Sequence, residues 1–327
     1  MKSRIRSEDS VSITNRDYIN YGIINLIIKE KKMAKKTSIG GWAYIWGGYS
    51  EAPIPLEEVL KKLAELGFDG IEMAAFPPHL ESNTKEKRAE VMKMLNKYKL
   101  GISGLAAPFP SPATSSQEDY IKAVKENLAM CVDMNIPKLR VDAVDAPTGI
   151  PGGMDYETCF SKVASVWNKA ADVCAKEGVK LIWEFEPGFL FNKPSEVTRM
   201  AYIVDHPNFS ILFDSCHAYM SAVLGSRHLG DKEILPKGVV QFAYMLTGKI
   251  GHIHLIDSDG TLHGEETSTH APLGTGFLNF DEIIPAILDA GYKDDWWPID
   301  LCFWPKALEA TAGCKIFLDD LIKKYGK

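Results

Sequence analysis

The sequence predicts a single α/β domain that folds as a closed (β/α)8 barrel, the TIM-barrel architecture. Eight short segments rich in β-branched and aliphatic residues alternate with helical patterns, which is typical of parallel strands covered by helices. Because the strands number eight and no GxGxxG motif opens the first helix, a barrel is favoured over an open doubly wound sheet. A length of 327 residues and a hydrophobic content of 46% suit one barrel with insertions.

The expected strands leave room for a helix between neighbours. They cover residues 37–44, 69–75, 101–107, 137–143, 179–186, 209–215, 250–257 and 296–303. Several intervening segments have apolar residues three and four positions apart and reach a glycine, which favours a helix with a glycine C-cap. These segments are 56–67, 85–101, 156–178 and 280–291.

Residues 1–36 are polar, low in glycine and unlike the remainder of the chain. We expect a disordered N-terminal extension or an over-extended reading frame with Met33 as the initiator, followed by the barrel over 37–327. The alternative is a helix that covers the barrel bottom or makes a subunit contact. The apolar run YGIINLII is too short to span a membrane, and no secretory signal is recognisable.

The composition points to a cytoplasmic protein that acts on a small molecule. None of the six cysteines forms a CxxC pair, and several lie in apolar runs, so reduced thiols are expected. The formal net charge is −6, and Lys and Arg form no stripe that could follow a phosphate backbone. We therefore expect neither a nucleic acid nor a membrane as a partner.

Residue types suited to metal binding occupy four successive strand ends. In a barrel the last residues of each strand face the active site. A lone acid at a strand end is more often a helix N-cap or a salt-bridge partner, and a lone histidine is usually a core residue. Four ends in a row, each one βα unit apart, favour a metal site instead. The residues are Glu184, Glu186, Asp214, His217, His252, His254, Asp257 and Asp300.

The fifth strand indicates why a cation is needed. Side chains alternate along a strand, so Glu184 and Glu186 share one face, and the bulky Trp183 and Phe185 suit the helix side. Two acids facing the barrel axis would be costly to bury without a cation. Three carboxylates and one imidazole form an oxygen-rich site, which favours Mn²⁺ or Mg²⁺, with Co²⁺ and Zn²⁺ also compatible.

At this point the sequence resembles the xylose isomerase-like barrels, known as sugar phosphate isomerases and epimerases. The resemblance covers about residues 37–325 and is specific to the superfamily rather than to one activity. It rests on GFDGIEM (67–73), GVKLIWEFEP (178–187), ILFDSCH (211–217), GHIHLID (251–257), HAPLGTGFLNF (270–280) and GYKDDWWPIDLCF (291–303).

The resemblance implies a role for each matching position. Glu184 would be a metal ligand and the acid/base, and Asp214 and His254 would be further ligands. His217 would contact the substrate. Asp300 would be the fourth ligand and the second acid/base, at a position where the family usually has Glu.

The resemblance also implies substrate-binding positions. Glu72, His79 and His270 match residues that line the pocket in similar proteins. Glu186 has no firm counterpart and would take the ligand role if the register differs by two. The aromatic residues, Trp42 and Trp304 among them, would stack on a sugar or an aromatic aglycone, with packing of the barrel as the alternative.

The first functional hypothesis is a metal-dependent isomerase or epimerase of a sugar or sugar phosphate. It would work by enediolate proton transfer between Glu184 and Asp300. Asp is one methylene shorter than Glu, so Asp300 reaches about 1.5 Å less, and proton transfer tolerates little error of that size. We expect a homo-oligomer that binds a carbohydrate.

The short Asp300 motivates a second hypothesis. Inosose dehydratases and the catalytic subunits of C-glycoside-cleaving enzymes resemble this barrel, so a metal-dependent lyase or dehydratase of a keto sugar or 3-keto glycoside is the alternative. His217 and His270 would then supply the base and the general acid, and an accessory subunit would be expected for a C-glycoside-cleaving enzyme. A remote alternative is a DNA-repair enzyme like endonuclease IV, which the acidic charge and the few histidines disfavour.

Overall fold

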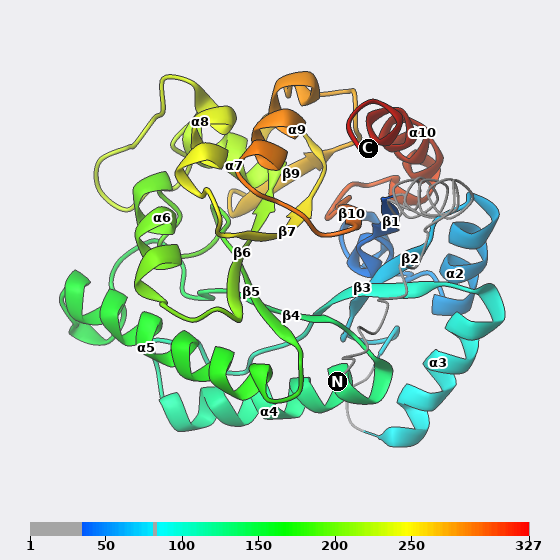
Figure 1. The fold of residues 1–327 in the computed structure, drawn as a ribbon, viewed down its shortest axis with the longest axis horizontal. Helices are drawn as coiled ribbons and strands as arrows, with labels where there is room; N and C mark the ends of the chain where they lie inside the picture. Colours follow the sequence, from blue (N-terminus) through cyan, green and yellow to red (C-terminus); the bar gives the residue numbers. More distant parts are fainter. Residues whose placement is uncertain (1–34, 81–83, 327) are drawn as a thin grey trace, which may run out of the picture. The chain divides into compact units, whose positions relative to one another are not determined.

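The computed structural model describes residues 35–80 and 84–326, which form a ring of parallel strands surrounded by helices (Figure 1). Strands β2 to β7 are neighbours in one sheet, and β1 pairs with β10. Parallel bridges from Gly40 to Glu72 and from Leu255 to Ile299 close the ring, so the predicted barrel is confirmed. The barrel strands are β1 (Lys36–Ile39), β2 (Gly70–Ala74), β3 (Gly101–Ala106), β4 (Lys138–Val141), β5 (Lys180–Glu184), β6 (Phe209–Asp214), β7 (Ile250–His254) and β10 (Trp296–Ile299).

Each of the eight predicted strand segments overlaps a barrel strand, and every strand is shorter than expected. The first ends at Ile39 because the following GWAY residues form a 3-10 helix, η1 (Gly41–Tyr44). The fifth ends at Glu184, so Glu186 lies in the loop beyond it. The expectation of an N-terminal extension concerns mainly residues outside the described ranges; β1 begins at Lys36.

Within residues 35–80 and 84–326, four helices occupy the segments in which periodic apolar residues predicted them, and five further helices were not singled out. Side chains of Thr84, Ser116 and Asp155 each accept a hydrogen bond from an amide in the first turn of a helix, which fixes where three of the helices begin. The helices are α2 (Leu56–Glu65), α3 (Lys85–Tyr98), α4 (Gln117–Met134), α5 (Tyr156–Ala175), α6 (Pro194–Ile203), α7 (Ser215–Ala222), α8 (Gly238–Met245), α9 (Phe280–Asp289) and α10 (Ala307–Tyr325), with short 3-10 turns η2 (Gly47–Tyr49) and η3 (Pro151–Gly153).

The alternation along β5 orients the candidate site. Trp183 packs on Trp167 of α5, with ring centroids 4.8 Å apart, and Phe185 packs on Phe242 of α8 at 5.0 Å. Both aromatic side chains therefore face the helices, as the sequence predicted. Glu184 and Glu186 consequently point the other way, toward the barrel mouth.

An antiparallel hairpin that the sequence did not predict follows β7. It consists of β8 (Asp257–His263) and β9 (Thr267–Ala271). The buried Asp257 carboxylate anchors its base by accepting hydrogen bonds from four amides. The donors are the backbone N–H groups of Ser258, Gly274, Gly276 and Leu278.

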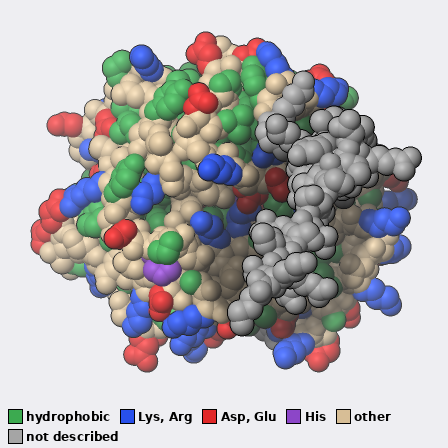
Figure 2. Space-filling view, viewed as in Figure 1, with side chains coloured by type: hydrophobic (Ala, Val, Ile, Leu, Met, Phe, Trp, Pro, Cys, Tyr) green, Lys and Arg blue, Asp and Glu red, His purple; other side chains and the backbone are tan. Residues whose placement is uncertain are grey.

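The surface carries charges of both signs. Figure 2 shows Lys and Arg side chains interspersed with Asp and Glu side chains over the face in view. Among the described residues, no helix is both long enough and apolar enough to cross a membrane.

We predict that Asp257→Ala destabilises the protein by about 3 kcal/mol or more, because it leaves several buried amides without acceptors. The free energy of unfolding from urea titration would measure the loss. Asp259→Ala is the matched control, since the Asp259 carboxylate bonds only the exposed Thr261. Equal stability of the two variants would contradict the anchoring role of Asp257.

Candidate metal centre at the barrel mouth

Four buried side chains meet where the strands end. Glu184, Asp214 and His254 are the last residues of β5, β6 and β7, and Asp300 follows β10 directly. One nitrogen or oxygen from each residue lies within 4.8 Å of the corresponding atom of every other. The structure therefore brings together the four residues that the sequence suggested as metal ligands.

The imidazole of His254 stands among the three carboxylates. Its Nδ1 lies 2.8 Å from Glu184 Oε1, 3.4 Å from Asp300 Oδ2 and 3.8 Å from Asp214 Oδ2. Asp214 Oδ2 is buried and has no hydrogen-bond partner among the described residues. A buried carboxylate oxygen without a partner, aimed at two further acids, fits the coordination that a divalent cation requires.

Two of the carboxylates are held by one oxygen each. Asp214 Oδ1 accepts the backbone N–H of His217 at 2.7 Å and thereby caps α7. Asp300 Oδ1 accepts the indole N–H of Trp42 at 2.7 Å and the backbone N–H of Cys302 at 2.8 Å. In each case the fold fixes one oxygen and directs the other toward His254.

The other side of His254 faces a buried acid deeper in the barrel. His254 Nε2 lies 3.3 Å from Glu72 Oε1, and Glu72 Oε2 contacts His252 Nε2 at 2.8 Å. A carboxylate behind a ligating histidine orients the ring and increases its basicity. Glu72, which the sequence suggested as a substrate-binding residue, is fully buried and is not among the residues that line the cavity.

Arg140 forms the main positive contact of the site. Its Nη1 lies 2.7 Å from Glu184 Oε2, and its Nε donates to Asp142 at 3.0 Å. Burial by itself would raise the pKa of Glu184, but Arg140 and His254 outweigh it and lower that pKa to about 2. Arg140 lies on β4, outside the strand ends in the second half of the chain at which the candidate ligands were predicted, so the contact was not expected.

The negative surroundings also act on His254 and Asp214. Burial opposes protonation of His254, but the carboxylates of Glu184 and Glu72 raise its pKa well above the ordinary value. Burial raises the pKa of Asp214 to about 7. The carboxylates that raise the pKa of His254, and that add to the effect of burial on Asp214, would equally attract a divalent cation.

A cavity of about 320 Å³ opens beside the four residues. Glu186 lines it together with Glu184, and Glu186 accepts a hydrogen bond from Thr267 of the hairpin. Burial and the nearby Asp142 raise the pKa of Glu186 to about 8. Glu186 is not among the four converging residues, so the geometry favours Glu184 over Glu186 as the ligand on this strand.

The surroundings shift the pKa values of two histidines in the cavity in opposite directions. His270 Nδ1 lies 3.3 Å from Asp300 Oδ1, and although burial opposes it, the carboxylates of Asp300 and Asp214 raise the pKa of His270 to about 9. Burial and the neighbouring His270 lower the pKa of His217 to about 3, and its Nδ1 contacts Ser268 Oγ at 2.8 Å. The carboxylates therefore favour the protonated form of His270, whereas burial favours the neutral form of His217.

Three further expected pocket residues lie elsewhere. His79 is buried, contacts the Ile54 carbonyl through Nε2 at 2.8 Å and does not line the cavity. Trp42 is 1% exposed and contacts Asp300 rather than open space. Trp304 lines a neighbouring groove. The aromatic walls of the cavity are Trp46, Phe76, Phe189 and Phe303. Trp46 is one of the aromatic residues that the sequence suggested for stacking on a ligand, whereas the three phenylalanines were not among them.

The chain is similar in sequence to known proteins. A family profile described as "Xylose isomerase-like TIM barrel" matches residues 60–320. A fructoselysine 3-epimerase of Escherichia coli O157:H7 is 22% identical over 256 residues, covering 73% of this chain and 83% of that protein.

Several solved structures share the fold. A D-psicose 3-epimerase from Clostridium cellulolyticum H10, solved with D-tagatose, superposes with a TM-score of 0.66 at 16% identity, covering 88% of this chain and 99% of that one. The IOLI protein with a bound zinc atom gives a TM-score of 0.68 at 18% identity over 89% of this chain and 99% of that one. The chain also matches 43% of a longer fusion of such a barrel with a 4-hydroxyphenylpyruvate dioxygenase, with a TM-score of 0.67 at 16% identity over 89% of this chain.

We predict that Asp214→Ala and His254→Ala each lower the affinity for Mn²⁺ at least about tenfold, because each removes one of four converging ligand atoms. Elemental analysis after dialysis, together with titration calorimetry, would measure the change. Glu184→Gln should behave like these variants, and Glu186→Gln, two residues further along the chain, is its matched control. Stoichiometric Mn²⁺ in the Asp214→Ala/His254→Ala double variant would rule the assignment out.

The raised pKa of Glu186 predicts a pH-dependent stability. The folded protein holds this proton up to about pH 8, whereas the unfolded chain releases it near the ordinary value of 4.5. The free energy of unfolding should therefore fall as pH rises between these values, by about 1.4 kcal/mol per pH unit for one proton.

Glu186→Gln should remove this slope, because an amide cannot ionise. Urea unfolding at several pH values, with Glu51→Gln at an exposed position as control, would measure it. An unchanged slope in Glu186→Gln would mean that another group carries the proton.

Proposed function

Because the chain belongs to the xylose isomerase-like TIM barrel family, we propose that it is a metal-dependent epimerase or isomerase of a keto sugar or sugar phosphate. The observation that carries the proposal is the convergence of three carboxylates and one imidazole beside a cavity of about 320 Å³. The similarity to 3-epimerases supports the reaction type. In this proposal the partner is a small carbohydrate, and the enzyme is a cytoplasmic homo-oligomer.

Glu184, Asp214, His254 and Asp300 would hold the ion. Their oxygen-rich set suits Mn²⁺ or Mg²⁺, and Co²⁺ or Zn²⁺ is also compatible. A bound divalent ion would polarise the carbonyl of the sugar and make the adjoining C–H group more acidic.

Glu184 would take the proton from the carbon beside the carbonyl. Arg140 keeps its carboxylate ionised and fixes its direction, so the group is always able to accept a proton. A carboxylate with so low a pKa is a weak base, and transfer to it therefore depends on the acidified C–H group.

Asp300 would return a proton on the opposite face in an epimerase. Strand β10 is separated from β5 by β6 and β7, so Asp300 approaches the cavity from another side of the ring. However, Trp42 and the Cys302 amide hold Asp300 Oδ1, and neighbouring histidines outweigh burial and lower the pKa of Asp300 well below the ordinary value. These contacts limit its reach and its basicity.

His270 favours a lyase as the second candidate function. Its ring lines the cavity, and the carboxylates around it favour the imidazolium. In an elimination, Glu184 would remove the proton beside the carbonyl, the carbon–oxygen bond at the next carbon would break, and His270 would give its proton to the leaving oxygen. The products would be an unsaturated keto sugar and the released alcohol or water.

The reaction type can be tested at Asp300. If the enzyme is an epimerase, Asp300→Glu supplies the longer side chain that the family usually has, and we expect turnover to stay within about tenfold of the native value. If Asp300 is only a ligand, the extra methylene crowds the ion and should reduce turnover by more than about a hundredfold.

Solvent deuterium provides an independent measurement. With Mn²⁺ and keto sugars in D₂O, an epimerase should leave deuterium on carbon in the recovered sugar, as seen by NMR. Asp300→Asn, which cannot return a proton, serves as the comparison. An eliminated product without any epimer would overturn the epimerase proposal in favour of the lyase.

A further inference from the structure

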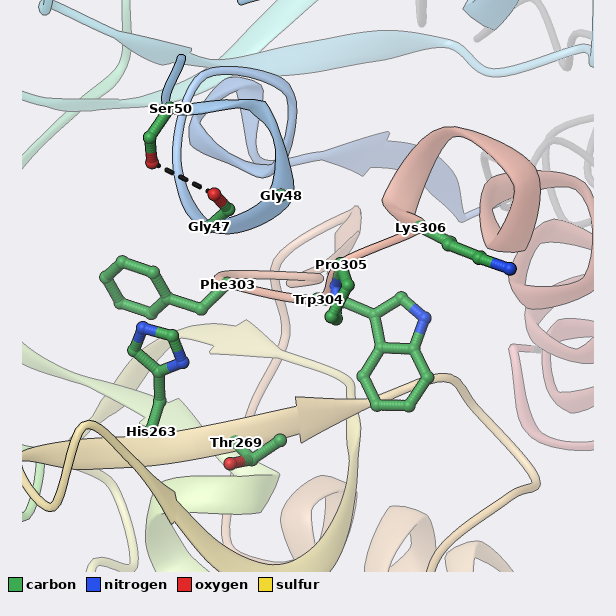
Figure 3. Close-up of a pocket in the computed structure, with 9 residues that line it drawn as sticks. All are labelled: Gly47, Gly48, Ser50, His263, Thr269, Phe303, Trp304, Pro305 and Lys306. Carbon is green, nitrogen blue, oxygen red and sulfur yellow. Dashed lines mark hydrogen bonds between the residues drawn. The ribbon is translucent and has the colours of Figure 1, made fainter. Parts of the chain in front are cut away.

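A second, larger groove adjoins the catalytic cavity. Its volume is about 610 Å³, compared with about 320 Å³ for the cavity, and Phe303 lines both. Figure 3 shows Phe303 and His263 on one side, the indole of Trp304 on the other and Thr269 on the strand beneath them. The remaining lining residues are Gly47, Gly48, Ser50, Pro305 and Lys306.

Three stacked rings connect the two spaces. Phe303 lies between Trp46 and His263, with ring centroids 5.9 Å and 4.4 Å away and interplanar angles of 17° and 5°. Trp46 lines the cavity, whereas His263 lines the groove. The stack therefore gives the cavity and the groove adjoining aromatic surfaces, with Phe303 between them.

Two glycines of the η2 turn allow it to pack closely against the loop after β10. A Cβ on Gly47 would lie 2.7 Å from Phe303 Cα, and one on Gly48 would lie 2.3 Å from the Pro305 carbonyl oxygen. Phe303 itself has a φ of 61°, a left-handed conformation that is costly for a bulky residue. The η2 turn and the loop after β10 thus fit closely, and Phe303 is held between the two spaces.

The residues that line the groove favour one class of ligand. The faces of Phe303, His263 and Trp304 are surfaces on which a flat ring packs well. The charged side chain of the lining is Lys306, and no carboxylate is among the lining residues, so a cationic substituent is disfavoured.

We propose that the groove binds an aromatic substituent carried by the sugar, so that the substrate class is an aryl-bearing sugar conjugate. This inference rests on the proposed function for the location of the sugar in the adjoining cavity. The sugar ring would lie beside the four converging residues, and the aryl group would extend past Phe303 to Trp304.

Binding of two matched probes to the full chain with Mn²⁺ tests the proposal. Phenyl and methyl β-D-glucopyranoside share the same sugar and differ only in the group on the anomeric oxygen, which is a phenyl ring in one and a methyl group in the other. Titration calorimetry should give a dissociation constant at least about tenfold lower for the phenyl compound, and saturation-transfer NMR should show its aromatic protons in contact with the protein.

Two variants locate the effect. Trp304→Ala should reduce the preference for the phenyl compound to within about twofold, and Ser50→Trp should do the same by filling the groove from its exposed side. Phe277→Ala is the matched control, because this exposed ring does not line the groove. Both probes should bind Phe277→Ala as they bind the native protein.

Equal affinity for the two probes, absence of binding of the phenyl compound, or a preference that survives both Trp304→Ala and Ser50→Trp would overturn the proposal. Deuterium exchange of unsubstituted keto sugars is measured separately. Exchange without a phenyl preference would refute the groove assignment alone, whereas a phenyl preference without metal binding or turnover would refute the proposed function alone.

Discussion

The burial of several carboxylates around one imidazole is the constraint on which the rest of this barrel depends. Glu184, Asp214 and Asp300 surround His254 at one end of the ring, and Glu72 faces the same imidazole from below. Charges this deeply buried are tolerated only when each has a partner. Arg140 and the histidines neutralise part of the excess, and a divalent cation would neutralise the remainder.

In two of these acids, one carboxylate oxygen is held by the surrounding fold and the other faces His254. One oxygen of Asp214 caps α7, and one oxygen of Asp300 is held by Trp42 and a backbone amide. The side chains are thereby fixed before any ion or substrate binds, which is the preorganisation that metal and catalytic sites require. In the proposed function the same anchoring would suit Asp300 to hold an ion and would limit it as a proton carrier, which is why the reaction type is tested at this residue.

The segments that follow the strands contribute further residues to the barrel mouth. The β8–β9 hairpin brings Thr267 to Glu186 and His270 to Asp300, and the loop after β10 places Phe303 between the cavity beside the four converging residues and the groove. Catalytic chemistry in barrels is supplied by strand ends and specificity by loops. Here the loops surround a cavity of about 320 Å³ and a groove of about 610 Å³, and the aromatic lining of the groove is the basis of the proposal that it binds a sugar conjugate.

Side-chain alternation and strand-end position are local properties, so the sequence predicted the eight strands, the orientation of Glu184 away from Trp183 and a set of eight candidate ligands at strand ends. The family resemblance reduced that set to the four residues that converge. Which other residues meet these four depends on the tertiary structure. Arg140, the hairpin and Phe303 approach the site from distant parts of the chain, whereas His79 remains in the core beside the Ile54 carbonyl. Depth within the barrel and contacts between loops have no periodic pattern, since they depend on how separate segments pack against one another.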